Sequence, residues 1–213
     1  MYNICDETII NMFKVLNNCR LPHIQIIKCL SKRYAENLIL YNKKCTDIDY
    51  KDNWNGTAFI CDGDLYIAIY SKLCFEEYVL TLIHELKHIM DIINIGIEYS
   101  ESLYNSNDLS SILEFRAKYI EIKIGYRLLD ANKINDFALE LINKYSVNEL
   151  IESLSTDKRF LCGILGICKA FKEYNKQNYA SVDRLLSVFN DLFSKLDNHC
   201  NEYCYNKLSM IKL

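Results

Sequence analysis

The feature that most constrains the fold of this chain is its scarcity of helix-breaking residues. Its 213 residues include only 6 glycines and 1 proline. Few breakers disfavour a sandwich or barrel, whose short strands need frequent tight turns, and favour long helices. Half of the residues are hydrophobic, which is ample for a core and excludes a disordered chain. We therefore predict a protein dominated by helix.

Charge and hydrophobicity narrow the expected partners and compartment. The formal net charge is −3 and the signs are well mixed, so neither nucleic acid nor a membrane surface is an expected partner. No apolar run reaches the roughly 18 residues of a membrane span, and residues 1–14 lack the pattern of an export signal. The 10 cysteines have no regular spacing and are interpreted as reduced thiols. These features predict a cytoplasmic protein.

Strands are expected only in the first third of the chain, which makes the fold class α+β. The segments Thr57–Cys61 and Leu65–Tyr70 are rich in β-forming residues and flank Asp62-Gly63-Asp64. An Asp-Gly pair between such segments is a strong hairpin signal. The remaining patterns of this third predict helices at residues 6–17 and 22–34 and a short strand at 37–41.

The rest of the chain is predicted to be helical. An apolar stripe begins at Phe75 and continues at helical spacing to Ile93, and Gly96 is a suitable stop. A second helix is expected from about Asp108 to Leu129. The segment after Ile134 predicts further helices with breaks near Ser146, Thr156 and Asn178.

The segment His84-Glu85-Leu86-Lys87-His88 inside the first of these helices is an HExxH motif. Residues four apart on a helix lie about 40° apart and one turn along, so both imidazoles can reach one metal ion. Glu85 falls about 100° from His84, beside the ion, where it can take a proton from a metal-activated water. Lys87 is not at a ligand position and can point to solvent. The motif predicts a zinc site.

A hydrolytic zinc ion needs a third protein ligand and one open position. Asp91 shares the stripe of the two histidines, but seven residues of straight helix span about 10.5 Å, too far for one ion. Asp91 is therefore expected to lie near the metal without binding it, or to face solvent. The candidates that remain downstream are Glu98, Glu101, Glu114 and Glu121.

Glu114 has two interpretations. It lies at the edge of the apolar stripe of the next helix, which suits a ligand that points toward a neighbouring helix. However, Ser111-x-x-Glu114 also matches a capping box, in which Glu114 would only satisfy a helix N-terminus. Spacing alone leaves both interpretations open.

The chain resembles the ImmA/IrrE family of intracellular zinc metallopeptidases over roughly residues 21–129. The resemblance rests on the order of elements, on the His84–His88 motif, and on Glu114-Phe115-Arg116-Ala117. In that family an HELxH helix is followed by a helix with a Glu-x-x-Ala pattern, whose glutamate binds the metal. The resemblance implies one Zn²⁺ per chain, held by His84, His88 and Glu114, with Glu85 as general base.

The resemblance also implies an architecture and a class of substrate. A zincin-like metallopeptidase domain would occupy residues 1–131, with its small sheet packed on the HExxH helix, and a helical C-terminal region would occupy 132–213. The substrate would be a protein or peptide, such as a transcriptional regulator of a phage or mobile element. By analogy with zincins, the strand Thr57–Cys61 would pair with an extended substrate, or would be an ordinary sheet strand. A tyrosine such as Tyr119 or Tyr126 could stabilise the oxyanion.

Two rival interpretations use the same residues. In one, the chain is a non-catalytic regulatory module with a zincin fold that binds a partner protein, and the helical C-terminal region is the docking surface. In the other, an ordinary helical protein carries a coincidental HExxH sequence. An intact Glu85 favours the enzyme, because a purely structural metal site needs no base beside the ion.

Overall fold

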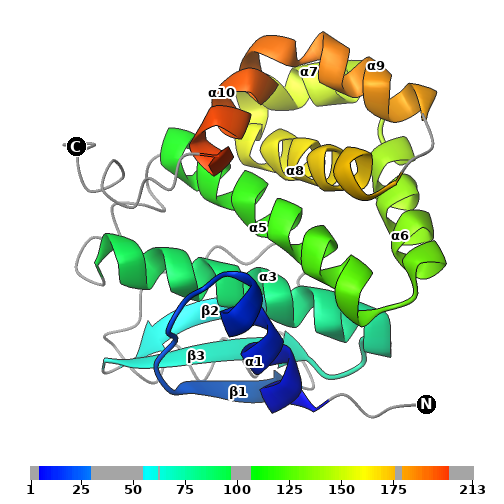
Figure 1. Cartoon of the computed structure of the whole chain (residues 1–213). Coiled ribbons are helices and arrows are strands. Elements are labelled where there is room, and N and C mark those ends of the chain that lie inside the picture. Colours follow the sequence, from blue (N-terminus) through cyan, green and yellow to red (C-terminus); the bar gives the residue numbers. More distant parts are fainter. Residues whose placement is uncertain (1–4, 30–54, 62, 97–106, 176–178, 202–213) are drawn as a thin grey trace. The chain divides into compact units, whose positions relative to one another are not determined.

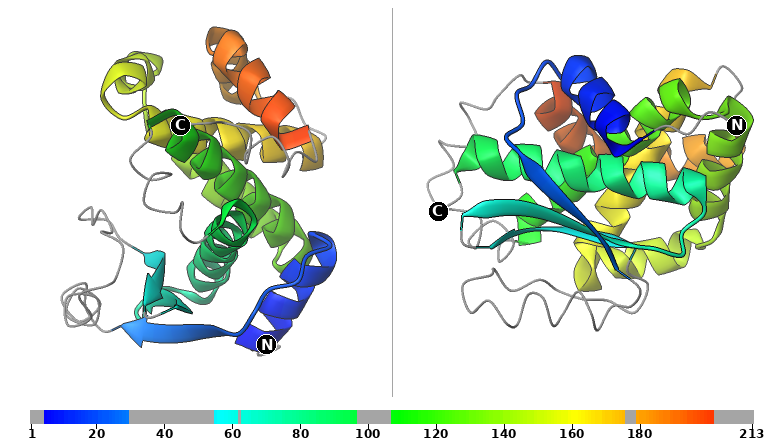
Figure 2. Two further views of the ribbon diagram at one scale, coloured as in Figure 1. Left: turned by 90° about the vertical axis from the view of Figure 1, so that its left-hand side faces the viewer. Right: turned by 90° about the horizontal axis from the view of Figure 1, so that it is seen from below.

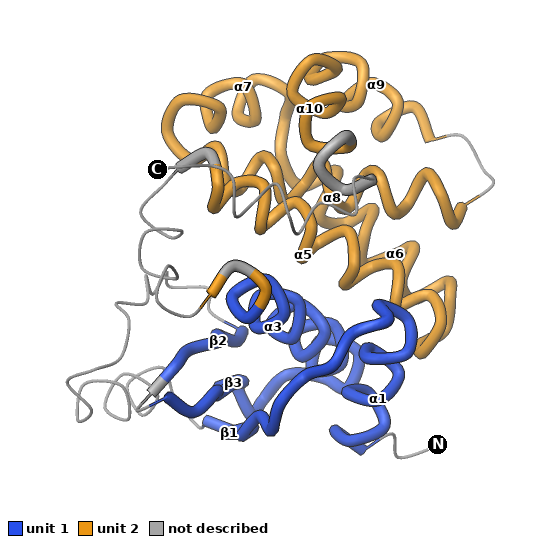
Figure 3. The backbone as a smooth tube through the Cα atoms, turned by 60° about the vertical axis from the view of Figure 1, so that its left-hand side comes forward, with its two compact units in different colours: residues 1–93 blue, residues 94–213 orange. Residues whose placement is uncertain are grey.

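The structure of the protein, a computed structural model, describes residues 5–29, 55–61, 63–96, 107–175 and 179–201 (Figure 1). The chain divides into two units, Met1–Ile93 and Asn94–Leu213 (Figure 3). The described residues are mostly helical, with a small mixed sheet in the first unit, so the predicted α+β class is confirmed.

The sheet of the first unit joins strands of both orientations. β3 (Asp64–Tyr70) lies in the middle, antiparallel to β2 (Gly56–Cys61) and parallel to β1 (Ile24–Cys29). The predicted hairpin is therefore confirmed. Gly63 in its turn has φ 87°, a conformation that favours glycine.

The prediction of a helix at residues 22–34 is wrong for its described part, because Ile24–Cys29 forms strand β1. Gln25 of β1 pairs with Tyr66 of β3, 41 positions further along the chain. Ile24 and Cys29 at the two ends of β1 are buried. The helical spacing of its isoleucines was outweighed by pairing with a distant strand. The strand predicted at 37–41 lies outside the described residues.

Two predicted helices of the first unit are confirmed. α1 (Asp6–Leu16) and α3 (Phe75–Ile95) lie next to each other in the first unit (Figure 2). The Tyr78 hydroxyl of α3 donates a hydrogen bond to Asp6 Oδ1 of α1, at 2.9 Å. Burial, together with the neighbouring Asp6 carboxylate, raises the pKa of Tyr78, so this donor stays protonated. Gly96, with φ 107°, follows the last turn of α3, as predicted.

The second unit is an assembly of helices around α8 (Lys158–Tyr174), whose residues 161–171 are all buried. α5 (Asn107–Leu128) packs along α8 so closely that a Cβ atom at Gly166 would collide with the carbonyl oxygen of Phe115. The other helices that contact α8 are α6 (Ala131–Asn143), α7 (Val147–Thr156), α9 (Ala180–Val188) and α10 (Asn190–Asn201).

The predicted breaks near Ser146 and Thr156 are confirmed. Ser146 caps α7 in a capping box with Glu149, and Thr156 is the last residue of α7. The domain boundary that the resemblance implies, after residue 131, differs from the division of the structure into two units, which falls after Ile93. The difference arises because α5 packs along α8 and so belongs with the C-terminal helices. Among the described helices, none is both long and apolar enough to cross a membrane.

Candidate metal centre

α3 carries the HExxH residues in its buried middle. Every residue from 79 to 92 is buried, including His84, Glu85 and His88. The helix places the two imidazoles one turn apart, with His84 Nε2 and His88 Nε2 3.0 Å from each other. Two nitrogen ligands of one tetrahedral zinc ion stand about 3.3 Å apart, given Zn–N bonds of about 2.0 Å. The pair is therefore spaced to bind one metal ion together.

His84, His88 and Glu114 form a group that could hold a metal ion. Each offers one ligand atom, and these atoms all lie within 4.8 Å of one another. Two imidazole nitrogens and one carboxylate oxygen are a ligand set of catalytic zinc sites, which keep a fourth position open. The residues present thus fit zinc by the chemistry of their donor atoms.

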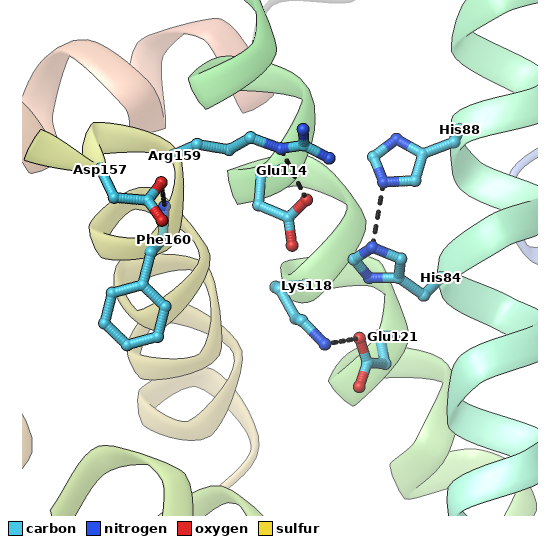
Figure 4. A network of polar contacts seen from close by, with 8 residues as sticks. All are labelled: His84, His88, Glu114, Lys118, Glu121, Asp157, Arg159 and Phe160. Carbon is cyan, nitrogen blue, oxygen red and sulfur yellow. Dashed lines mark hydrogen bonds and ion pairs between the residues drawn. The ribbon is translucent and has the colours of Figure 1, made fainter. Parts of the chain in front are cut away.

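Glu114 lies well inside α5, in its third turn from the start at Asn107. The capping-box interpretation is therefore wrong, because it requires Ser111 to precede the first turn of the helix. The Glu114 side chain is 14% exposed, and its Oε2 atom lies 3.6 Å from Nε of Arg159 on α8 (Figure 4). This carboxylate is thus held within the second unit by an ion pair.

The other candidate glutamates have different outcomes. Glu121 is buried about two turns beyond Glu114, and its Oε2 accepts a hydrogen bond from Lys118 Nζ at 2.8 Å (Figure 4). It is not in the group that could hold a metal ion. Glu98 and Glu101 lie outside the described residues.

Lys87 does not point to solvent, although its position in the motif allowed this. Lys87 is only 2% exposed and donates to Asp91 Oδ1, one turn further along α3. Asp91 is 1% exposed, so it does not face solvent. Burial of either charge alone would cost several kcal/mol, roughly, so the two charges must stay together. The HExxH turn thus contains one member of a buried ion pair, and the other member lies one turn further along α3.

The start of β2 lies against the turn of α3 that carries Glu85. A Cβ atom at Gly56 would stand 2.5 Å from Thr81 Cγ2 and 3.4 Å from Glu85 Cγ. A side chain at this position would therefore displace Thr81, and glycine permits the close approach. β2 is also one edge of the described sheet. An edge strand thus begins next to the predicted general base.

The two tyrosines considered for the oxyanion are engaged within the second unit. The Tyr119 hydroxyl donates to Glu173 Oε2 at 2.8 Å, and the Tyr126 hydroxyl donates to Asn135 Oδ1 at 2.6 Å. Burial raises the pKa of Tyr126 to about 12. Neither residue belongs to the group that could hold a metal ion.

Sequence reasoning missed three residues around the candidate centre, namely Gly56, Arg159 and Gly163. A Cβ atom at Gly163 would stand 3.3 Å from Glu114 Cγ, so this glycine borders the candidate ligand. The Gly163-x-x-Gly166 spacing in an apolar helix was a readable signal of close helix packing, although it does not name the partner helix. No local signal identified Arg159, which meets Glu114 only through the fold.

No family model matches the chain, and no curated protein or solved structure is significantly similar to it. A buried pair of imidazoles, a carboxylate as a third donor and a second carboxylate beside the pair are the components of metal-assisted hydrolysis.

Proposed function

We propose that this protein is a zinc-dependent endopeptidase. The observation that carries the proposal is the group of His84, His88 and Glu114, whose ligand atoms lie within 4.8 Å of one another. It supports the ligand set that the ImmA/IrrE resemblance implies, including the glutamate that spacing alone left open. A zincin-like arrangement of the HExxH helix belongs to the same proposal.

The residues divide the chemistry between them. His84, His88 and Glu114 would hold the ion, and such a three-ligand set would leave a position for water or substrate. When bound, zinc supplies a Lewis acid that polarises the peptide carbonyl and makes water more acidic. Glu85 accepts the proton that the attacking water releases and then donates it to the nitrogen of the leaving amine. Its burial beside the histidines supports this role, because exclusion of bulk water strengthens the electrostatic interactions of a charged group in the site.

The substrate in this proposal is an extended segment of a regulatory protein. β2 is one edge of the described sheet, and its first residue, Gly56, lies against Glu85. An extended peptide that pairs with β2 would therefore pass the general base with its own backbone. This geometry supports β-pairing and suits a peptide bond in an extended chain better than a small molecule.

Zinc content is the first test. We expect about one zinc ion per chain in protein purified without added metal, measured by mass spectrometry of the metal. His88→Ala should lose the ion, because two ligands bind zinc far more weakly than three. Glu114→Gln should weaken binding, since an amide oxygen is a poorer ligand than a carboxylate. Folded wild-type protein that takes up no zinc even after incubation with it would overturn the proposal.

Peptide cleavage then separates the enzyme from the non-catalytic module. We expect the zinc-loaded protein to cleave members of a mixed peptide library, detected by mass spectrometry, and Glu85→Gln to reduce the rate by about 10²–10⁴-fold. Zinc content should be unchanged in Glu85→Gln, because Glu85 is not a ligand. Zinc binding without any cleavage that depends on Glu85 would favour the regulatory module.

A further inference from the structure

The carboxylate of Glu114 is held by a helix that lies far along the chain from it. Arg159, in the first turn of α8, places its Nε atom 3.6 Å from Glu114 Oε2. The Arg159 side chain is 41% exposed and that of Glu114 is 14% exposed, so the pair sits at the border of the buried region. An arginine in this position can fix the direction of a carboxylate without enclosing it.

A glycine of the same helix shapes the space around this carboxylate. A Cβ atom at Gly163 would stand 3.3 Å from Glu114 Cγ and 3.5 Å from Glu114 Oε1. Arg159 and Gly163 are four residues apart, so they lie on one face of α8. One carboxylate oxygen of Glu114 therefore faces the Arg159 guanidinium (Figure 4). The other oxygen lies beside Gly163.

The distance between α5 and α8 is set one turn further along. A Cβ atom at Gly166 would collide with the carbonyl oxygen of Phe115, the residue that follows Glu114. The backbone that carries Glu114 is thus pressed against α8. Both the backbone and the carboxylate of this residue are restrained by the same helix.

From these contacts we infer that α8 positions the third metal ligand, Glu114. Arg159 is the positioning residue, and Gly163 leaves room for the Glu114 side chain. The inference rests on the proposed zinc site. It assigns a role in metal binding to α8, a helix outside the HExxH motif. Groups that orient a metal-binding carboxylate commonly change metal affinity about 10-fold to 100-fold when removed.

The experiment measures zinc affinity of the full chain by competition with a chromophoric chelator, so it needs no peptide substrate. We expect Arg159→Gln to weaken zinc binding by about 10-fold or more, and Arg159→Lys to retain most of the affinity because a cation remains. The matched control is Lys172→Ala. Lys172 is an exposed cation of the same helix that pairs at 3.0 Å with Asp183, not with Glu114, and its loss should leave the affinity unchanged.

The outcomes separate this inference from the proposed function. If Arg159→Gln binds zinc as tightly as wild type while Glu114→Gln binds it more weakly, the zinc site stands and the positioning role of Arg159 is wrong. Tighter binding by Arg159→Gln would also overturn the role, because it would mean that the guanidinium competes with the ion for Glu114. If wild type binds no zinc, the proposed function and this inference fail together. Thermal unfolding checks that each variant is folded.

Discussion

The two units of this protein hold the candidate ligands in contrasting ways. In the first unit, His84 and His88 come from a single helix turn, are buried, and need only the regular geometry of α3 to face one ion. In the second unit, Glu114 is partly exposed and depends on Arg159 and Gly163 of another helix. Ligands of the first kind are specified by local spacing, whereas a ligand of the second kind is specified by packing between helices.

The largest expected effect tests whether the HExxH helix depends on its buried charges. Lys87→Ala leaves the 1%-exposed Asp91 without its lysine, and we expect a loss of about 3–5 kcal/mol in the free energy of unfolding. The measurement is urea unfolding of metal-free protein, followed by circular dichroism. Replacing both residues, as in Lys87→Met with Asp91→Leu, should recover much of the loss, because neither charge of the pair remains buried without its partner.

The control for this prediction is an exposed ion pair of the same unit. Lys28 lies 3.7 Å from Asp6, and the two side chains are 57% and 34% exposed. Lys28→Ala should therefore cost less than about 1 kcal/mol. Equal losses in the free energy of unfolding for Lys87→Ala and Lys28→Ala would contradict the expectation that burial makes the loss of Lys87 costly.

An intermediate effect tests how tightly α5 and α8 pack in the second unit. Alanine in a helix interior normally gains up to about 1 kcal/mol over glycine. At Gly166 the added Cβ atom would meet backbone, so we expect Gly166→Ala to lose about 1–3 kcal/mol, measured by thermal unfolding. Gly163→Ala is the matched substitution. The atoms nearest to its new Cβ atom belong to the side chains of Glu114 and Lys118, not to backbone, so its cost should be smaller. The reverse order would contradict the packing described here.

The smallest expected effect compares helix starts in the two units. Ser146 caps α7 through the backbone amide of Glu149, so Ser146→Ala should cost about 1 kcal/mol in chemical denaturation. Cys5 starts α1 without a side-chain cap, so Cys5→Ala should cost almost nothing. Equal costs would contradict this assignment of caps.

The cap in the second unit also predicts a dependence on pH. Hydrogen bonds from the backbone amide and the hydroxyl of Ser146 lower the pKa of Glu149. A carboxyl whose folded pKa is lowered contributes stability above its unfolded pKa and loses it as the pH falls through the folded pKa. The difference between wild type and Ser146→Ala should therefore be larger at neutral pH than in acid.

The contrast between the units also explains what the sequence could predict. The hairpin, α3 and α5 were predictable because each depends on neighbours within a few residues, through turn chemistry or helical periodicity. The HExxH residues were predictable for the same reason. The prediction of Glu114 as a metal ligand depended on the resemblance, because its spacing from Ser111 also matched a capping box. Only the start of α5 at Asn107 excluded the capping box.

The predictions that the structure contradicts concern residues with partners far away in the sequence. Local spacing predicts a helix at residues 24–29, but these residues form β1 because they pair with β3. The spacing of the motif allows Lys87 to point to solvent, because spacing does not show that a whole turn of α3 is buried. In the structure, Asp91 provides the partner that makes burial of Lys87 tolerable. Arg159 could not be connected to Glu114 from the sequence, since α5 and α8 are separated by two other helices.

The mixed sheet has a consequence for the order of folding. The hairpin of β2 and β3 closes through a turn of two residues, whereas the parallel pairing of β1 joins positions 41 residues apart. Closing a longer loop costs more chain entropy, by about 0.6 kcal/mol for each doubling of its length, and slows the search for contact. The hairpin and α3 follow one another along the chain, so they can assemble before β1 arrives. On this view the two imidazoles and Glu85 acquire their surroundings early, and β1, with α1 attached, closes the sheet afterward.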